Sequence, residues 1–237
     1  PWGPHRHDEL ISGQIIGNPT PLVDSRWKVT GQARYGDDIR LPNELIGRIV
    51  RSPHHYARVL SIDCSSALSV PGVIAVATGA DAENKFGVLP VTKDEHAMAV
   101  DRVRHAGDLV ACIAAESESI AREAERLIEV EYEILDSIHD MRDGLDDSEN
   151  PIHDRGKYHI GESNIQKRVF QEFGDIEGMS ENAIVSHEKN WLFAGVNHAF
   201  TEPHAVVAHW DPSGRLTLYT PQQVPHYVHR ALADVLE

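Results

Sequence analysis

The chain has few cysteines and little positive charge, and both shortages exclude classes of function. It carries only Cys64 and Cys112 among 237 residues, with no Cys-x-x-Cys pair. Iron–sulfur clusters usually take four thiolates, so this chain cannot hold one alone, and it lacks the cysteine pair of a structural zinc site. Lys and Arg number 22 against 37 Asp and Glu, which gives a net charge of −15. That charge repels the phosphates of nucleic acids and of anionic membrane surfaces.

A long apolar run and a secretory leader are also missing. No stretch of about 18 apolar residues occurs, so we expect no membrane span. The opening residues, PWGPHRHDEL, lack the charged and then apolar regions of a secretory signal. Both cysteines lie in apolar, strand-like runs, where the expected role is that of small core residues. We therefore expect a soluble protein in a reducing compartment, the cytoplasm.

The common catalytic and nucleotide-binding motifs are absent. The sequence has no nucleophile elbow, no phosphate-binding P-loop and no dinucleotide-binding glycine turn, so none of those three enzyme classes is supported. The carboxylate pairs at 37–38 and 146–147 lie in polar loops, where solvated turns are expected rather than acid–base chemistry. Fifteen histidines occur, but no third ligand joins His226 and His229 on their helix face. We expect packing and surface roles for the histidines and no metal site.

Turn residues and short apolar runs predict the organisation of the first 136 residues. Residues 1–22 contain four prolines and three glycines, a composition typical of an extended arm. The pattern that follows predicts an α+β domain over residues 23–136, with one amphipathic helix at 119–128 capped by Ser117 or Ser119. The expected strands are residues 45–52, 57–63, 72–78, 108–117 and 130–134.

The rest of the sequence predicts a linker and a second, smaller unit. Residues 137–163 are acidic, rich in Gly, Asn and Asp, and without apolar periodicity, so we expect a linker there. Residues 164–237 follow as the second unit. Its expected strands are 164–175, 182–193, 205–211 and 215–220, and its expected helix is 225–237. Because this unit is small and its last helix has an apolar face, we expect the chain to be one part of a truncated, cleaved or split protein.

Four segments carry a resemblance that covers nearly the whole chain. Residues 21–63 contain Val-Asp, Lys-Val-Thr-Gly and a strand ending in Arg-Ser-Pro-His, and residues 70–81 contain Pro-Gly-Val. Residues 101–135 join Gly-Asp, a buried strand, a helix and Val-Glu-Tyr-Glu, and residues 195–236 begin with GVNHAFTEPHAVVAHWD. Together these segments resemble the large, molybdenum-cofactor subunit of the xanthine oxidase, or molybdenum hydroxylase, family.

The resemblance implies a fold and an activity. The fold is α+β, with an α/β hammerhead domain at 23–136 and then the first strands and helix of an incomplete molybdopterin-binding domain. The activity is hydroxylation or reductive dehydroxylation of an aromatic or heterocyclic substrate by a multi-subunit oxidoreductase. The family's catalytic residues lie outside this segment, so we expect the chain alone to be inactive.

The resemblance also implies cofactors and partners. Molybdenum–molybdopterin would be completed by downstream chain, while iron–sulfur centres and FAD would lie on partner subunits. The implied partners are the remainder of the large subunit, an iron–sulfur subunit and an FAD subunit, assembled as a dimer of heterotrimers in the cytoplasm.

Within the family, three short segments are most similar to the 4-hydroxybenzoyl-coenzyme A reductase large subunit. They are FGVLP at 86–90, the tripeptide Val196-Asn197-His198, and QVPHYVH at 223–229. Xanthine-type hydroxylases typically carry a Gln beside molybdenum where this chain has Val196, which argues against a xanthine-like site. The resemblance thus places Val196, Asn197 and His198 near the cofactor. A hydrogen-bonded turn between strands is the alternative role for Asn197 and His198.

Other functions remain open at this stage. A non-catalytic scaffold or interaction module could retain the hammerhead domain, and metal storage through the histidines would predict stoichiometric zinc or nickel. For an enzyme, the substrate could be an aromatic thioester, a purine, an aldehyde or a nicotinate-like heterocycle. The departure at Val196 and the segment 223–229 favour the aromatic thioester.

Overall fold

The chain forms two compact units, each assembled from segments that are distant in sequence. The smaller unit combines the chain up to Arg40 with His198–Pro221, and the larger combines Leu41–Asn197 with Gln222–Glu237. The computed structural model describes residues 20–88, 93–146, 151–153, 164–165 and 169–237.

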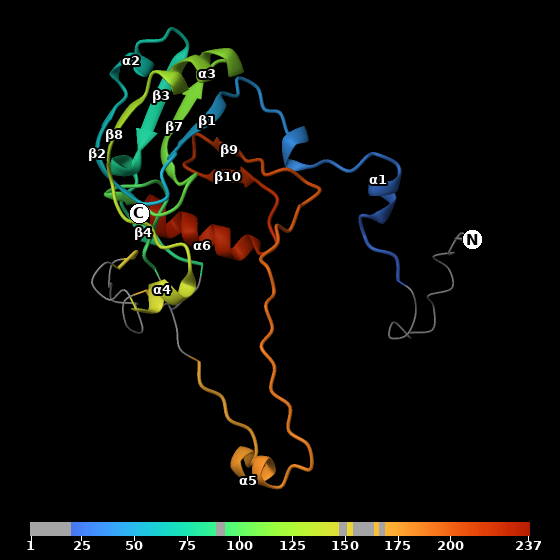
Figure 1. The fold of residues 1–237 in the computed structure, drawn as a ribbon. Helices are drawn as coiled ribbons and strands as arrows, with labels where there is room; N and C mark the ends of the chain where they lie inside the picture. Colours follow the sequence, from blue (N-terminus) through green and yellow to red (C-terminus); the bar gives the residue numbers. More distant parts are fainter. Residues whose placement is uncertain (1–19, 89–92, 147–150, 154–163, 166–168) are drawn as a thin grey trace. The chain divides into compact units, whose positions relative to one another are not determined.

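The larger unit is built on a three-stranded antiparallel sheet with an apolar central strand. β7 (Leu109–Ala115) lies between β1 (Ile46–Arg51) and β3 (Val73–Thr78). All seven β7 residues are apolar, and the strand contributes Ala111, Ile113 and Ala115 to one core cluster and Val110 to a second. Helix α3 (Glu118–Arg126) packs on one face of this sheet and contacts all three strands (Figure 1).

Local chemistry explains why α3 begins and packs where it does. The Ser117 hydroxyl accepts a hydrogen bond from the backbone N–H of Ile120, which satisfies one of the unpaired donors of the first turn. Such a cap stabilises a helix by about 1 kcal/mol. Ala121 and Ala124 are buried, and their small side chains let the helix lie close to the sheet.

Arg48 connects the same helix to the sheet electrostatically. Its guanidinium on β1 lies 2.8 Å from a Glu118 carboxylate oxygen and 2.5 Å from one of Glu125, both on α3. The hydrogen bond that Arg48 donates to Glu125 is the main cause that raises the pKa of Arg48. All three groups are partly exposed, so packing of the apolar face stabilises this helix more than these ion pairs do.

A second three-stranded sheet adjoins a second core cluster in this unit. β2 (Ala57–Asp63) lies between β6 (Arg102–Val103) and β8 (Glu129–Ile134), and both pairings are antiparallel. Along β8, half-buried Val130 and Tyr132 alternate with exposed glutamates, which is the pattern of a strand with one wet face. The cluster itself contains the buried Ala57, Ala99, Val103 and Val110.

Short elements complete the larger unit. They are α2 (Ser65–Leu68), η3 (Gly79–Asp81), β4 (Lys85–Phe86), β5 (Glu95–His96), α4 (Met141–Asp146), α5 (Ile176–Glu181) and α6 (Pro225–Leu236). α6 contacts β4, and the ammonium of Lys93 lies 2.8 Å from the Asp234 carboxylate. Of the two segments that single out one branch of the resembled family, 86–90 begins with the last residue of β4, and 223–229 includes the first turn of α6.

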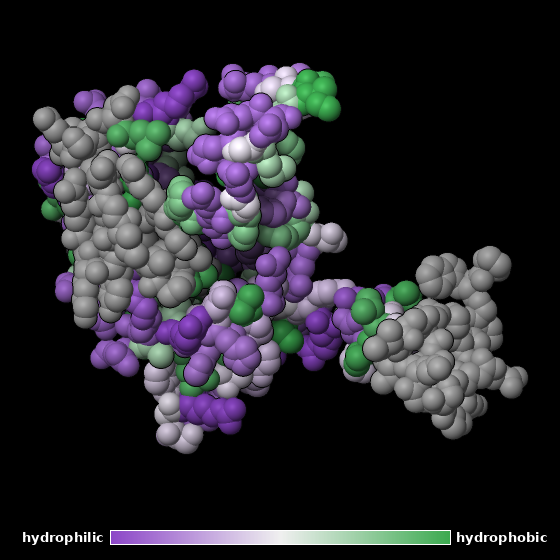
Figure 2. Space-filling model, turned by 90° about the horizontal axis from the view of Figure 1, so that it is seen from below, coloured by the Kyte–Doolittle hydropathy of each residue, from purple (hydrophilic) through white to green (hydrophobic). Residues whose placement is uncertain are grey.

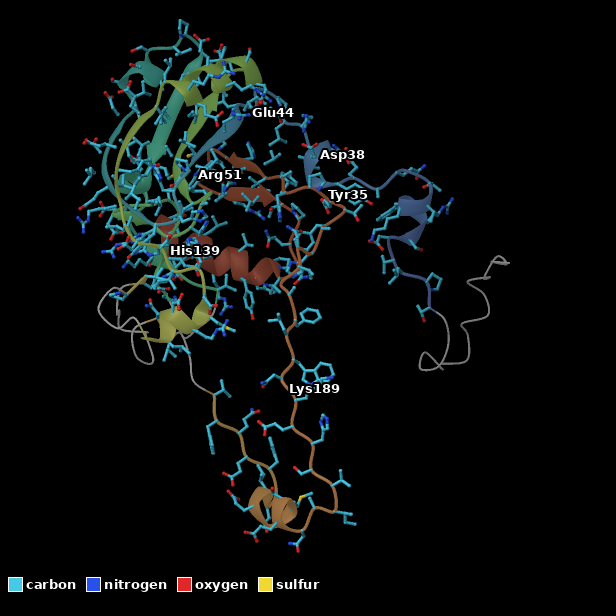
Figure 3. All side chains as sticks on the ribbon, viewed as in Figure 1. Tyr35, Asp38, Glu44, Arg51, His139 and Lys189 are labelled. Carbon is cyan, nitrogen blue, oxygen red and sulfur yellow. The ribbon has the colours of Figure 1, made fainter. Side chains whose placement is uncertain are left out.

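The smaller unit contains a hairpin and two short helical turns. α1 (Ser25–Val29) and η2 (Gly36–Asp38) precede it in sequence, and β9 (Val207–Trp210) pairs with β10 (Leu216–Tyr219). In η2 the Asp38 carboxylate accepts a hydrogen bond from the backbone N–H of Tyr35 at 2.9 Å, and Figure 3 labels both residues. Asp37 and Asp38 thus lie in a short turn without buried residues, in line with the turn predicted for that pair.

The structure confirms most of the elements predicted for the first 136 residues, and it also confirms the last hairpin and helix. Two other predicted strands are wrong. None of the described residues of 164–175 is in a strand, and 182–193 contains no strand either. Their sequences suit strands, but a strand forms only where a partner backbone pairs with it, and the described chain supplies none. The segment predicted as a linker contains α4, while residues 147–150 and 154–163 of it lie outside the described part.

Hydrophilic residues cover much of the face drawn in Figure 2, with separate hydrophobic groups between them. Among the described residues, no helix has the length and apolar character needed to cross a membrane.

Both cysteines are unpaired and half-buried. Burial raises the pKa of the Cys112 thiol in β7, and burial is also the main cause that raises the pKa of Cys64, with the charges of Asp63 and Asp81 adding to it. A raised pKa lowers the thiolate fraction at neutral pH, and the thiolate is the reactive form.

We therefore expect both thiols to react with iodoacetamide at pH 8 at least about ten times more slowly than a free thiol. The rate should rise steadily with pH, and the measurement is mass spectrometry of timed aliquots. In 8 M urea, both thiols should react as fast as glutathione. Equal rates in the folded and unfolded chain would contradict the burial of these side chains.

Candidate functional site

The larger unit contains a polar cavity of about 480 Å³, which is a candidate functional site. Its lining contains three imidazoles, two guanidiniums and three carboxylates, including His96, Arg102, Arg104 and His153. Charged groups gathered in a cavity are typical of functional sites but also of structural ion-pair networks. The hydrogen-bond and ion-pair partners of these groups distinguish a functional site from a structural network.

The arginines of the cavity are engaged with a neighbouring aspartate. Arg102 Nε donates to Asp101 Oδ2 at 2.9 Å, and Arg104 Nη2 lies 3.6 Å from Asp101 Oδ1. Burial tends to raise the pKa of Asp101, but the Arg102 hydrogen bond and the Arg104 charge outweigh it and hold the pKa below its usual value. Asp101 thus offsets part of the positive charge of the two guanidiniums from within the protein.

Side chains in and beside this cavity also bind the described residues 151–153. Arg104 Nε donates to the carbonyl of Ile152 at 3.0 Å, and the Tyr56 hydroxyl donates to the carbonyl of Pro151 at 3.2 Å. His153 Nδ1 lies 3.0 Å from a carboxylate oxygen of Asp94. These contacts join residues that flank β2, β5 and β6 to a segment that follows them in sequence.

The surroundings of His96 favour its neutral form. Burial is the main cause that lowers the pKa of His96, and the positive charges of Lys85 and Arg104 add to it. In the described part of the chain, no three His, Cys, Asp or Glu side chains converge as metal ligands. The described residues that line the cavity include no nucleophile paired with a general base. We therefore interpret the cavity as a structural one, whose polar side chains hold residues 151–153 in place.

Other histidines pack against aromatic rings. The His54 ring meets Tyr132 edge-on with centroids 4.9 Å apart, and His55 meets His139 in the same way at 5.0 Å. His139 is labelled in Figure 3, and its Nε2 is also 2.8 Å from the Ser137 hydroxyl. These contacts are of the packing kind expected from the sequence.

The three residues predicted near a cofactor lie consecutively on an exposed, extended segment. Val196 is 76% exposed, and Asn197 and His198 are exposed as well. The division between the two units falls between Asn197 and His198. Lys189, labelled in Figure 3, projects from the same segment and lies 4.3 Å over the ring of Trp191. By themselves the three residues form no cradle for a pterin, so this segment does not fit the cofactor without further polypeptide.

Sequence reasoning did not single out Phe200, next to that tripeptide, and it gave His204 only a packing or surface role. The rings of His198 and Phe200 are stacked, with centroids 5.4 Å apart and planes at 5°. Phe200 also meets His204 edge-on at 5.6 Å and 78°. The signal in the sequence was the spacing of rings in HAFTEPH, which places three of them within seven residues.

Comparison with known proteins gives two consecutive domain matches. Residues 30–136 match the family model of the aldehyde oxidase and xanthine dehydrogenase a/b hammerhead domain, and residues 159–237 match that of the molybdopterin cofactor-binding domain. The two matches together include most of the chain.

Individual relatives agree with the domain matches. The nicotinate dehydrogenase large molybdopterin subunit of Eubacterium barkeri is 32% identical over 94% of this chain and 51% of its own length. The xanthine dehydrogenase of Calliphora vicina is 31% identical, over 93% of this chain and 16% of its own length. The solved structure of quinoline 2-oxidoreductase from Pseudomonas putida 86 has a TM-score of 0.73 at 26% identity, over 90% of this chain and 28% of that one. The chain thus spans about half of one relative and a smaller share of the other two.

Proposed function

Because the chain belongs to the aldehyde oxidase and xanthine dehydrogenase family of molybdenum hydroxylases, we propose that it is the N-terminal segment of the molybdenum-cofactor subunit of a multi-subunit oxidoreductase. The observation that carries the proposal is the order of the two domain matches, hammerhead first and cofactor-binding domain second. The relatives' greater length supports a role as one part of a larger subunit.

The proposal assigns a role to each segment of the sequence. In this proposal, residues 1–22 form an arm, 23–136 the hammerhead domain, 137–163 a linker and 164–237 the start of the cofactor-binding domain. Residues 196–198 lie near the cofactor and form one wall of its site, which further polypeptide completes. When bound, the molybdenum cofactor supplies the redox chemistry, and the catalytic side chains come from outside this segment.

For the substrate, we propose an aromatic or heterocyclic ring compound. Val196, in place of a polar Gln, and the segments 86–90 and 223–229 favour a 4-hydroxybenzoyl-coenzyme A reductase-like reaction, the reductive removal of a phenolic hydroxyl. Hydroxylation of a heterocycle is the second candidate, because two of the relatives are named for nicotinate and xanthine. A non-catalytic scaffold lacks comparable support, since both of these relatives are named as dehydrogenases.

The proposal extends to partners and location. Electrons would pass between the molybdenum centre and iron–sulfur and FAD centres on partner subunits, since the two cysteines of this chain are too few for a cluster site. The assembly would be a dimer of heterotrimers that includes the remainder of the large subunit, located in the cytoplasm.

The test is isolation of the native complex through a tag on this chain. We expect molybdenum and pterin in equal amounts by elemental analysis and fluorescence, and turnover with one member of a panel holding 4-hydroxybenzoyl-coenzyme A, nicotinate, xanthine and an aromatic aldehyde. Residues 1–237 alone should show no turnover. Absence of molybdenum from the native complex, or turnover by the isolated chain, would overturn the proposal.

A further inference from the structure

We propose that Ile152 bridges the hammerhead domain and the domain that follows it, and that this bridge fixes where the second domain begins. The backbone of this one residue is bound at both of its polar groups. Its carbonyl accepts a hydrogen bond from Arg104 Nε at 3.0 Å, and its N–H donates to Asn164 Oδ1 at 2.8 Å. The bridge has this role whichever reaction the subunit performs.

The two partners of Ile152 belong to different domain matches. Arg104 lies within residues 30–136, the hammerhead match, and Asn164 lies within 159–237, the cofactor-binding match. Ile152 lies in neither range. All three residues belong to the larger unit and line its polar cavity. Because Ile152 is bonded to both matched domains, a change at one partner can reach the other through it.

Arg104 is a firm attachment point on the hammerhead side. Its side chain is only 12% exposed, and its Nη2 lies 3.6 Å from a carboxylate oxygen of Asp101. Its backbone N–H donates to Asp108 Oδ2 at 2.9 Å. Hydrogen bonds donated by a charged group are stronger than neutral ones, and partial burial strengthens them further. The Ile152 carbonyl is therefore bound by a side chain that other contacts hold in place.

Asn164 suits the other end of the bridge. Its φ is +58°, in the left-handed region that asparagine adopts more readily than most residues. Its amide oxygen accepts the N–H of Ile152, which is 12 residues away in sequence. Glycine adopts the same backbone angle without strain, so Asn164→Gly removes the amide oxygen and still permits the turn.

The residues on either side of Ile152 are bound to the same domain as its carbonyl. The Tyr56 hydroxyl donates to the carbonyl of Pro151 at 3.2 Å. His153 Nδ1 lies 3.0 Å from a carboxylate oxygen of Asp94. Three consecutive residues are thus in contact with side chains of the hammerhead match.

The test is hydrogen–deuterium exchange of the Ile152 amide in the native complex, read by mass spectrometry at single-residue resolution and corrected for the intrinsic rate. Arg104→Met should speed this exchange about ten-fold or more, because loss of the carbonyl partner frees the whole residue. A guanidinium only donates, so Arg104 cannot itself accept that N–H. Arg104→Gln places an N–H donor at the position of Nε and should return the rate to within about three-fold of the parent.

Arg51→Met is the matched control. Arg51, labelled in Figure 3, lies in β1 of the same unit and donates to the carbonyl of Gly107 at 2.8 Å. The same substitution therefore removes the same kind of bond at a different place, and the Ile152 amide should exchange at the parent rate. The Ile113 amide of β7 should stay protected in each variant, which shows that the sheet is intact.

A double variant tests whether the two ends act together. In Asn164→Gly the Ile152 N–H has already lost its acceptor, so adding Arg104→Met should speed the exchange by less than about three-fold. A further ten-fold increase in the double variant would show two independent contacts and contradict the bridge.

The other outcomes are equally decisive. An Ile152 amide that is unprotected in the parent, unchanged in Arg104→Met, or accelerated equally in Arg51→Met would overturn the bridge, as would an Arg104→Gln variant as fast as Arg104→Met. If Arg104→Met loses the protection of β7, Tyr56→Phe replaces it and should speed the exchange about three-fold or more, and an unchanged rate there would overturn the bridge. A native complex without molybdenum would overturn the proposed function and leave these rates valid.

Discussion

Replacing Gly79 with alanine is expected to lower the free energy of unfolding of the larger unit by about 3 kcal/mol. Gly79 is buried at the start of η3, directly after β3. A Cβ there would lie 2.3 Å from the carbonyl oxygen of Ala99 and 2.7 Å from its carbonyl carbon, far inside van der Waals contact. The Ala99 backbone cannot withdraw freely, because its N–H donates to the Leu109 carbonyl at 2.7 Å.

Urea denaturation followed by circular dichroism measures this loss. Gly47→Ala is the matched control, because Gly47 lies in β1 and its Cβ would meet nothing within 4 Å. That control should be neutral or more stable by up to about 1 kcal/mol, since alanine reduces the entropy of the unfolded chain. A Gly79→Ala variant as stable as Gly47→Ala would show that the two backbone segments are not in close approach in solution.

Elements of the larger unit were predictable where the signal is local. The seven consecutive apolar residues of β7 predict a buried strand, and Ser117 before an amphipathic run predicts the start of a helix. The helix begins at Glu118, one residue before the predicted start, because Ser117 rather than Ser119 is the cap. The family and the fold class were predicted from motifs, and the comparisons confirm both.

Elements whose existence depends on distant partners were not predictable. β4, β5 and β6 have two residues each, too few for any periodicity, and they form because another strand lies beside them. The converse holds for 182–193, which has strand-like composition without a partner strand in the described structure. The two discontinuous units could not be predicted for the same reason. Contacts between the N-terminal part of the chain and residues 198–221 join segments distant in sequence, and local sequence patterns do not encode such contacts.

The sequence predicted only some residues of the candidate site, for a related reason. Val196, Asn197 and His198 were singled out by resemblance, and their role near a cofactor stays a prediction. Phe200 and His204 lie inside a segment that carries the resemblance, but their ring contacts and the turn held by Glu202 are visible only in the structure. Orientation of side chains on an irregular segment follows from backbone angles such as that of Ala199, which composition does not encode.

Replacing Ile113 with alanine is expected to lower the free energy of unfolding of the larger unit by about 3–4 kcal/mol. Ile113 is 2% exposed at the centre of β7, among the largest fully buried side chains of the described residues. It packs in the cluster that α3 forms with the sheet, where Ala111 and Ala121 are already small and cannot expand into a vacated space. The loss therefore combines the missing apolar transfer energy with a cavity that stays open.

Ile49→Ala separates this packing effect from strand propensity. Ile49 lies in β1 and pairs with Cys112, next to Ile113, but its side chain is 41% exposed. The same substitution there removes the same atoms from a paired strand without opening a buried cavity, so it should cost under about 1 kcal/mol. The difference between the two midpoints in urea, at unchanged slope, measures the buried contribution. Equal losses would mean that α3 does not cover Ile113, and that the helix lies off the sheet in solution.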